Sequence, residues 1–320
     1  WESLMAFRKS PANTASASIA DVVALLADFS VETTPTSASK VANFADHLTQ
    51  GTTVNVTCLA GTDPADTIAV AARLRREGFE PVPHVAARSI TDRGTLDRFL
   101  GRLKDEAGVT QALVIAGGLD RPTGAFGSSM DLLETGLFQQ HGISKLGVAG
   151  HPEGTPDISE QALKDALVWK NRFARETGLE LYIETQFCFD ADAIIAWDKK
   201  IRGWGNTLPI HLGVPGLASL KTLLKFAQMS GIGPSIRVLT RQARNIAKLM
   251  LVQAPDRLIL DLAAYRAQDA ECGIEKLHFY PFGGLAKSAE WANMLATGAF
   301  EIDSSRFEIK PATAQIRAVS

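Results

Sequence analysis

The chain has 320 residues, of which 46% are hydrophobic and 21% are charged, and its formal net charge is -2. This is the composition of a globular protein, long enough for one large α/β domain or two smaller ones. The near-neutral charge lacks the basic footprint of nucleic-acid and membrane-surface proteins, so we expect neither kind of partner.

The cysteines and the N-terminus indicate a cytoplasmic protein. Cys58, Cys188 and Cys272 lie far apart and form no CxxC or zinc spacing, which is typical of reduced thiols. No apolar run approaches the roughly 18 residues that a membrane helix needs, and residues 1–17 lack the apolar block of a signal peptide. We expect residues 1–18 to be disordered or foreign to the natural chain, residues 19–300 to form one catalytic domain, and residues 301–320 to be a polar tail.

Helical and strand-like segments alternate along the chain. Residues 19–27 carry apolar side chains at helical spacing, whereas residues 53–58 alternate between apolar and polar as a half-buried strand does. Asp63-Pro64 and Thr91 are helix-start signals, and Gly78 and Gly108 close those two helices. The predicted strands are 29–32, 53–58, 81–85, 112–116, 145–149, 181–187, 208–213 and 276–280. The predicted helices are 19–27, 37–48, 63–78, 91–108, 130–139, 159–177, 194–201, 217–229, 240–251, 255–267 and 287–296.

Eight strands, each followed by helical sequence, predict an α/β fold of the (β/α)8 TIM-barrel type with a leading helix and extra helices. The alternative is a doubly wound open sheet. That fold favours GxGxxG after the first strand, where this chain has Thr33-Thr34-Pro35, and the chain has no GxxxxGK[ST] motif either.

Catalytic groups of such barrels lie at the carboxyl ends of the strands. The residues at these predicted ends are Glu32, Thr57, His84, Gly117-Gly118 with Asp120, His151-Pro152-Glu153, Gln186, 213–216 and Phe279-Tyr280. The ring has one carboxylate at its first position, with Glu153 as the only comparable second acid, and it lacks the ligands of a catalytic zinc. We expect an aromatic, hydrogen-bonding ligand and no metal. Taken singly, Glu32, Thr57 and His84 could each be structural, and His278 is expected to face the helices.

Seven segments, in order, resemble those of the methylenetetrahydrofolate reductase family across roughly residues 20–300. They are Phe29-Ser-Val-Glu32, Val54-Asn-Val-Thr57, Pro83-His84, Gly147-Val-Ala-Gly-His-Pro-Glu153, Thr185-Gln186-Phe187, Val214-Pro215-Gly216 and His278-Phe279-Tyr280. No single segment is specific, but seven in register are.

The resemblance implies a flavoprotein that uses flavin adenine dinucleotide (FAD) and NAD(P)H to interconvert 5,10-methylenetetrahydrofolate and 5-methyltetrahydrofolate. It places the enzyme in one-carbon metabolism and methionine biosynthesis, with tetrahydrofolate derivatives as partners and a possible homo-oligomer. Glu32 would be the general acid. The implied cofactor-binding residues are Thr57, His84, Ile115, Ala116, Gly117, Gly118, Asp120, Ala149, His151 and Lys170. The implied substrate-binding residues are Glu32, Asp120, Gln186, Phe279 and Tyr280.

Four positions depart from the family pattern, and the register slips by about one residue around Lys170. The family's later His is Thr155, and its Arg after His-Phe-Tyr is missing, with Lys287 as the nearest cation. The family's Asp after the fourth strand is Gly118 here, so Asp120 is the candidate replacement, and the family's Tyr is His151. Two alternatives remain open. One is a flavin-independent reductase with direct hydride transfer from NAD(P)H, and the other is a folate-binding partner of a methyltransferase without a redox role.

Overall fold

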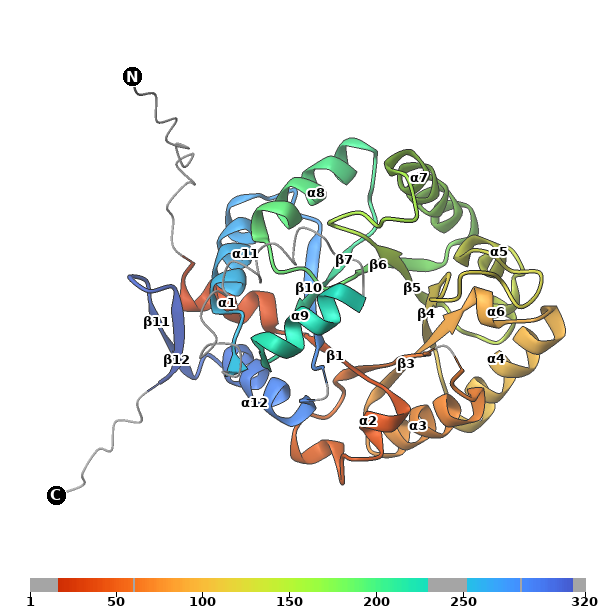
Figure 1. Ribbon diagram of the computed structural model, residues 1–320, viewed down its shortest axis with the longest axis horizontal. Coiled ribbons are helices and arrows are strands. Elements are labelled where there is room, and N and C mark those ends of the chain that lie inside the picture. Colours follow the sequence, from red (N-terminus) through yellow and green to blue (C-terminus); the bar gives the residue numbers. More distant parts are fainter. Residues whose placement is uncertain (1–16, 60, 230–251, 283, 313–320) are drawn as a thin grey trace.

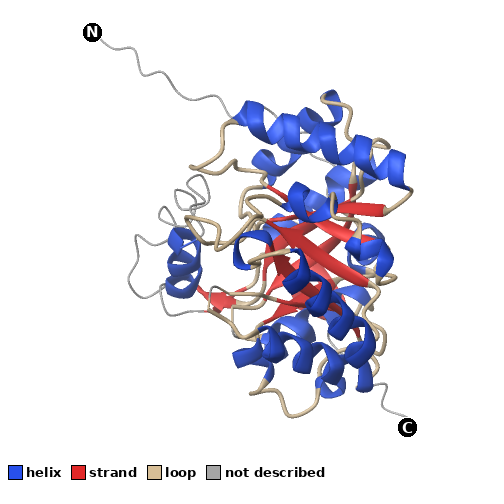
Figure 2. Ribbon diagram, turned by 90° about the vertical axis from the view of Figure 1, so that its right-hand side faces the viewer, coloured by secondary structure: helices blue, strands red, loops and turns tan. Residues whose placement is uncertain are grey.

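Eight parallel strands close into a barrel in the order β1-β10-β7-β6-β5-β4-β3-β2 (Figure 1). The computed structural model describes residues 17–59, 61–229, 252–282 and 284–312. Helical structure follows each barrel strand along the chain, and the side view shows the strands running through the middle of a shell of helices (Figure 2). The predicted (β/α)8 barrel is therefore confirmed.

The barrel strands are β1 (Ser30–Thr33), β2 (Thr53–Val56), β3 (Glu80–Ala86), β4 (Gln111–Ile115), β5 (Lys145–Gly150), β6 (Glu180–Thr185), β7 (Ile210–Pro215) and β10 (Ile274–Tyr280). The helices are α1 (Ile19–Leu26), α2 (Pro35–Ala38), α3 (Pro64–Arg76), α4 (Arg93–Ala107), α5 (Ser129–Leu133), α6 (Leu137–Gln140), α7 (Glu160–Thr177), α8 (Ala191–Gly203), α9 (Leu220–Met229), α11 (Asp256–Gln268) and α12 (Leu285–Ala296), with short 3-10 turns η1 (Phe44–Asp46) and η2 (Ala87–Ser89). Two antiparallel pairs lie outside the barrel, β8 (Ala218–Ser219) with β9 (Val252–Gln253) and β11 (Phe300–Asp303) with β12 (Glu308–Pro311). No described helix is long and apolar enough to cross a membrane.

Local chemistry accounts for the helix ends. The Asp63 carboxylate accepts the Ala65 backbone N–H at 2.8 Å, and proline fills the first position of α3. The predicted cap of α4, Thr91, is wrong by one residue, because the Asp92 carboxylate accepts the Thr95 N–H at 2.8 Å.

The helix predicted over residues 37–48 is wrong. Only α2 and η1 form there, and the Arg73 guanidinium of α3 donates to the carbonyls of Ala38 (2.9 Å), Val41 (2.7 Å) and Ala42 (3.0 Å). These carbonyls therefore find partners outside a continuous helix.

Other predicted segments also differ from the structure. The helix predicted over residues 130–139 is split into α5 and α6, with Gly136 in the left-handed region (φ 70°) between them. The predicted tail contains the β11–β12 hairpin, which buries Phe300 and Ile309. The predicted helix 240–251 and residues 1–16 lie outside the described residues.

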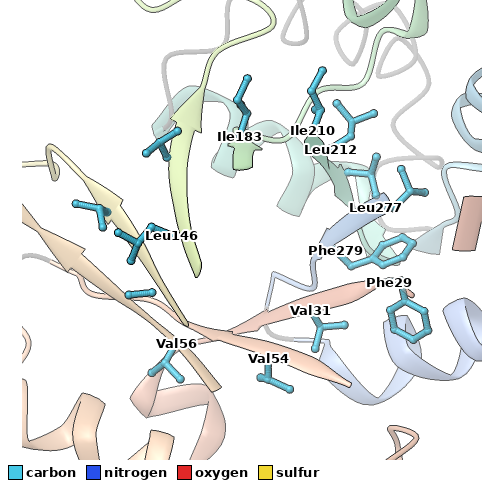
Figure 3. Close-up of a cluster of buried hydrophobic side chains, with 14 of the residues drawn as sticks. Phe29, Val31, Val54, Val56, Leu146, Ile183, Ile210, Leu212, Leu277 and Phe279 are labelled. Carbon is cyan, nitrogen blue, oxygen red and sulfur yellow. The ribbon is translucent and has the colours of Figure 1, made fainter. Parts of the chain in front are cut away.

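The main apolar core is a ring between the strands and the helices, called the annular core below. Alternate residues of each strand point outward into it, among them Val31, Val54, Ile183 and Leu212 (Figure 3). The opposite face of each strand is directed into the barrel, so these interior positions are free to carry a site.

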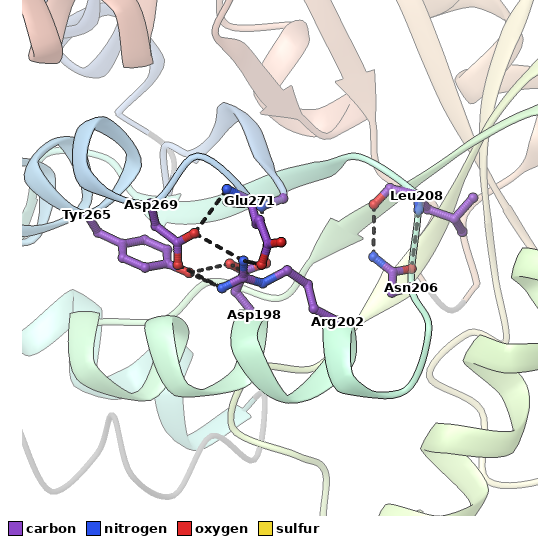
Figure 4. Close-up of polar contacts among 8 residues, drawn as sticks. Asp198, Arg202, Asn206, Leu208, Tyr265, Asp269 and Glu271 are labelled. Carbon is purple, nitrogen blue, oxygen red and sulfur yellow. Dashed lines mark hydrogen bonds and ion pairs between the residues drawn. The ribbon is translucent and has the colours of Figure 1, made fainter.

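A buried polar network fixes α8 to α11 and to the turn before β10 (Figure 4). Asp198 is fully buried and accepts a hydrogen bond from the Tyr265 hydroxyl, while Arg202 pairs with Asp269 at 2.8 Å. This network lies outside the barrel and has a structural role, because every one of its members contacts another.

Helix α9 lies across the carboxyl end of the barrel (Figure 1). Leu220, Leu223 and Ala227 form a second apolar cluster with Phe187, which follows β6, and with Phe282, which follows β10. This second apolar cluster therefore partly covers the mouth of the barrel.

Candidate functional site

The interior of the barrel is polar, although branched apolar side chains fill most barrels of this kind. Among the buried or half-buried polar residues that converge there, seven come from strands β1, β2, β3, β6 and β10. They are Ser30, Glu32, Asn55, His84, Glu184, His278 and Tyr280.

Glu32 lies near the carboxyl end of β1, as predicted. Although 17% of its side chain remains accessible, the surrounding barrel buries the carboxyl enough to raise its pKa from 4.5 to about 7. The Thr57 hydroxyl opposes this shift, but Thr57 Oγ1 makes no full hydrogen bond within the described residues. His84 Nε2 lies 3.8 Å from Glu32 Oε2, and burial lowers the His84 pKa to about 3. A neutral His84 does not hold Glu32 ionised, so Glu32 can carry a proton at neutral pH.

The prediction of a single carboxylate is wrong, because Glu184 of β6 is a second acid in the interior. Its side chain is buried, and Asn55 Nδ2 donates to Glu184 Oε1 at 2.6 Å. Burial raises the pKa of Glu184 to about 8, and the negative charge of Glu32 adds to the rise, while the Asn55 hydrogen bond and the charge of Lys276 oppose it. The available sequence signal was the alternation of β6, which directs residues 182 and 184 to the same face as Gln186.

The expectation for His278 is also wrong, because its ring lies inside the barrel. His278 Nδ1 lies 2.8 Å from Ser30 Oγ and 3.8 Å from Glu184 Oε2. Its neighbour Phe279 points outward and packs edge-on against Trp291 of α12, with ring centroids 6.0 Å apart. The prediction that Phe279 binds substrate is therefore wrong, since the two-residue period of β10 places it in the annular core.

Tyr280 and Gln186 lie at the mouth. The Tyr280 hydroxyl donates to the Thr185 carbonyl at 3.0 Å, and its ring meets Phe187 with centroids 5.2 Å apart. The Gln186 side-chain oxygen accepts the Phe187 N–H at 3.1 Å. The negative charges of Glu32 and Glu184 add to burial in raising the pKa of Tyr280. The aromatic residues Phe187 and Phe282 were not among the predicted site residues.

The loop after β4 does not bring Asp120 into the interior. Asp120 is exposed, and no contact joins it to Glu32 or Glu184 within the described parts of the chain. The Arg88 guanidinium holds this loop by donating hydrogen bonds to the backbone carbonyls of Leu119 (2.9 Å) and Gly127 (3.2 Å). Glu184, rather than Asp120, is thus the acid that interacts with Glu32.

The glycines of this loop allow close packing at the end of β4. Gly117 has φ 90°, and a Cβ there would lie 3.0 Å from Ala86 Cβ, whereas Gly118 faces open space. Ile115 and Ala116 are half-buried beside it. The segment therefore presents backbone, with little side chain, to the end of the barrel.

A buried cation lies beyond the end of β5. The Lys170 side chain of α7 is buried, and among the described residues no carboxylate forms an ion pair with it. Burial lowers its pKa to about 8. Burial and the charge of Lys170 together lower the pKa of His151 to about 4, and Ala149 is half-buried nearby in β5. An amine in this setting favours an anionic group such as a diphosphate.

No group of three or more His, Cys, Asp or Glu side chains is arranged to hold a metal ion in the parts of the chain that the structure describes.

Comparisons with known proteins give a consistent result. Residues 18–281 match the family model described as methylenetetrahydrofolate reductase. Methylenetetrahydrofolate reductase 1 of Schizosaccharomyces pombe is 32% identical over 89 residues, which cover 27% of this chain and only 14% of that protein. An uncharacterized protein from Clostridium thermocellum, which binds two copies of 5-methyl-5,6,7,8-tetrahydrofolic acid, has a similar fold (TM-score 0.50) at 12% identity, covering 86% of this chain and 99% of that one.

Proposed function

The chain belongs to the methylenetetrahydrofolate reductase family, and from this premise we propose that it interconverts 5,10-methylenetetrahydrofolate and 5-methyltetrahydrofolate. The observation that carries the proposal is Glu32, a half-buried carboxyl at a strand end, enclosed by the barrel, whose pKa is raised to about 7. A general acid acts best when its pKa lies near the working pH, because it is then both protonated and able to give up the proton.

In the reductive direction, Glu32 donates its proton to the arylamine nitrogen of the bridged folate. The bond from the bridging carbon to that nitrogen then breaks, its electron pair stays on nitrogen, and the carbon is left as an iminium that accepts hydride. The Thr57 hydroxyl stabilises the carboxylate that remains on Glu32. His84 stays neutral because of its burial, so it does not draw the proton from Glu32 in the resting site.

The pterin would lie at the mouth, between polar and aromatic groups. Gln186 offers its amide N–H groups, and the Tyr280 ring and Phe187 offer apolar faces for stacking. The second apolar cluster, which α9 forms with Phe187 and Phe282, would exclude water from this ligand.

The residues present fit FAD. Lys170 and His151 would hold its diphosphate, since the buried ammonium has no carboxylate partner in the described residues. Thr57 Oγ1 and His84 Nε2 are buried polar atoms that make no full hydrogen bond within the described residues, so they can hydrogen-bond a polar ring. Ile115, Ala116, Gly117, Gly118 and Ala149 would line the rest of that site. When bound, the flavin supplies the hydride.

The proposal extends to the setting of the enzyme. We propose NAD(P)H as electron donor, tetrahydrofolate derivatives as substrates, a cytoplasmic location in methionine biosynthesis, and a homo-oligomeric state.

The test combines the absorbance spectrum of the purified protein with turnover of methylenetetrahydrofolate and NAD(P)H. We expect flavin absorbance that NADH or NADPH bleaches and that the folate restores. Glu32→Gln should bind the folate but lose nearly all turnover, whereas Glu180→Gln, an exposed acid of β6 paired with Lys145, should behave as the wild type.

Each alternative has its own outcome. Turnover by a colourless protein would favour direct hydride transfer from NAD(P)H and refute the flavin. Folate binding without turnover would favour a non-redox partner of a methyltransferase. Full activity of Glu32→Gln would remove Glu32 from the mechanism.

A further inference from the structure

Several buried polar atoms inside the barrel have no hydrogen-bond partner in the described parts of the chain. Asn55 Oδ1, Thr57 Oγ1, His84 Nε2 and His278 Nε2 are four such atoms among the described residues. Buried polar atoms are nearly always hydrogen-bonded, to protein, water or ligand. Their gathering around Glu32 and Glu184 marks a compartment in which hydrogen bonds, and with them protons, can be exchanged.

Glu184 is tied to the strand that neighbours Glu32. Asn55, which donates to Glu184 at 2.6 Å, is the register partner of Glu32 across the β1–β2 pair. The negative charge of Glu32 is felt at Glu184, as the rise in the Glu184 pKa shows. The two carboxyls therefore belong to one electrostatic unit and titrate as a pair.

The other titratable groups around Glu184 leave this pair without a strong counter-charge. His84 and His278 are held neutral by burial, and Lys276 is already paired with Asp28 at 2.9 Å. The groups that face the barrel interior from β1, β3, β6, β7 and β10 are Glu32, His84, Tyr182, His211, Lys276, His278 and Tyr280.

We propose that Glu184, which Asn55 links to the strand beside Glu32, is a second proton donor that returns a proton to Glu32 after Glu32 has protonated the folate. The idea rests on the proposed function. In this step the O–H bond of Glu184 breaks and an O–H bond forms on Glu32, so the negative charge moves from Glu32 to Glu184. The Asn55 hydrogen bond, and more weakly the charge of Lys276, stabilise the charge there. Solvent then replaces the proton of Glu184.

The similar pKa values of the two carboxyls allow this exchange in both directions. Glu184 is a positioning and proton-storing residue in the chain's own interior, whereas Glu32 alone meets the substrate. The contribution of Glu184 should therefore appear in the rate at which the enzyme returns to its starting state, and not in the rate of the first proton transfer.

The first arm of the test needs no ligand. Infrared difference spectra of the purified wild type, recorded through a pH titration, should show two protonated buried carboxyls that ionise near and above neutral pH. Glu32→Gln and Glu184→Gln should each remove one, and in Glu32→Gln the remaining Glu184 carboxyl should titrate at lower pH by about one unit, because the Glu32 charge that raises its pKa is gone. The surface variant Glu180→Gln should keep both. An unchanged titration of Glu184 in Glu32→Gln would overturn the proposal.

The second arm separates the first turnover from later ones. With methylenetetrahydrofolate and the reduced enzyme, Glu184→Gln should complete a first turnover within about twofold of the wild-type rate, while its steady-state rate falls about tenfold with little change in KM. An equal fall in both rates would indicate a merely structural role, and no fall in either would exclude proton storage. A wild type without turnover would refute the proposed function, and the infrared titration would then decide on its own whether the two carboxyls titrate as a coupled pair.

Discussion

The two buried acids should make the protein less stable as the pH rises. An acid whose pKa is higher in the folded than in the unfolded chain binds more protons when folded, so stability falls above the unfolded pKa and the loss is complete above the folded pKa. For Glu184 these values are 4.5 and about 8. Replacing Glu184 with glutamine removes the titration while keeping an oxygen that can accept the Asn55 hydrogen bond.

The size of the effect follows from linkage. With these pKa values, the free energy of unfolding of the wild type should fall through Glu184 by about 3 kcal/mol between about pH 5.5 and about pH 8.5. Glu184→Gln should lack this part of the fall, whatever the amide itself costs at one pH.

Urea denaturation at the two pH values measures the difference. Comparing each protein with itself cancels the effect of the substitution on packing, and Glu180→Gln serves as a matched control at the exposed start of the same strand. If the free energy of unfolding depended on pH equally in the wild type and in Glu184→Gln, the reasoning would be refuted. Glu184 would then titrate like a solvent-exposed carboxyl and not like a buried one.

Three further outcomes are expected. Lys170→Met should weaken FAD binding at least about tenfold in a fluorescence titration. Riboflavin binding should stay unchanged, since only FAD carries the diphosphate, and equal losses for both ligands would contradict the role of Lys170. Asp120→Asn should keep kcat/KM within about twofold because Asp120 is exposed, and a large loss would return it to the site. Gly213→Ala should cost about 1–3 kcal/mol in urea denaturation, because the new Cβ would lie 2.3 Å from the Thr185 carbonyl oxygen and 2.8 Å from Tyr280 Cε2; unchanged stability would mean that β7 can move away.

The order of strands and the strand-end residues could be predicted from local patterns. Alternation and helix-start signals are properties of neighbouring residues, so they identified the eight strands and placed Glu32 at the end of β1. They failed where a distant residue decides the outcome. The segment after α2 lacks a continuous helix, and Arg73, 35 residues from Ala38, binds carbonyls there.

The second acid of the site was missed for a related reason. Glu184 and Asn55 are 129 residues apart and meet only when the barrel closes. The side on which a strand residue lies can be predicted from its period of two, but its neighbours across the barrel depend on the register of several strand pairs. The same difficulty explains the errors at His278 and Phe279. The sequence did not show which face of β10 is directed into the barrel, so the inward and outward positions of these two neighbours were predicted the wrong way round.

The annular core separates the demands of folding from those of chemistry. Since the apolar packing that holds the barrel together lies between strands and helices, side chains on the inner face contribute little to it. An inner residue can therefore change without opening a cavity in the main core, and a new acid such as Glu184 can be acquired in one substitution while the scaffold stays intact. In a protein built in this way, substitutions confined to the inner face of the barrel can change the reaction that the site supports.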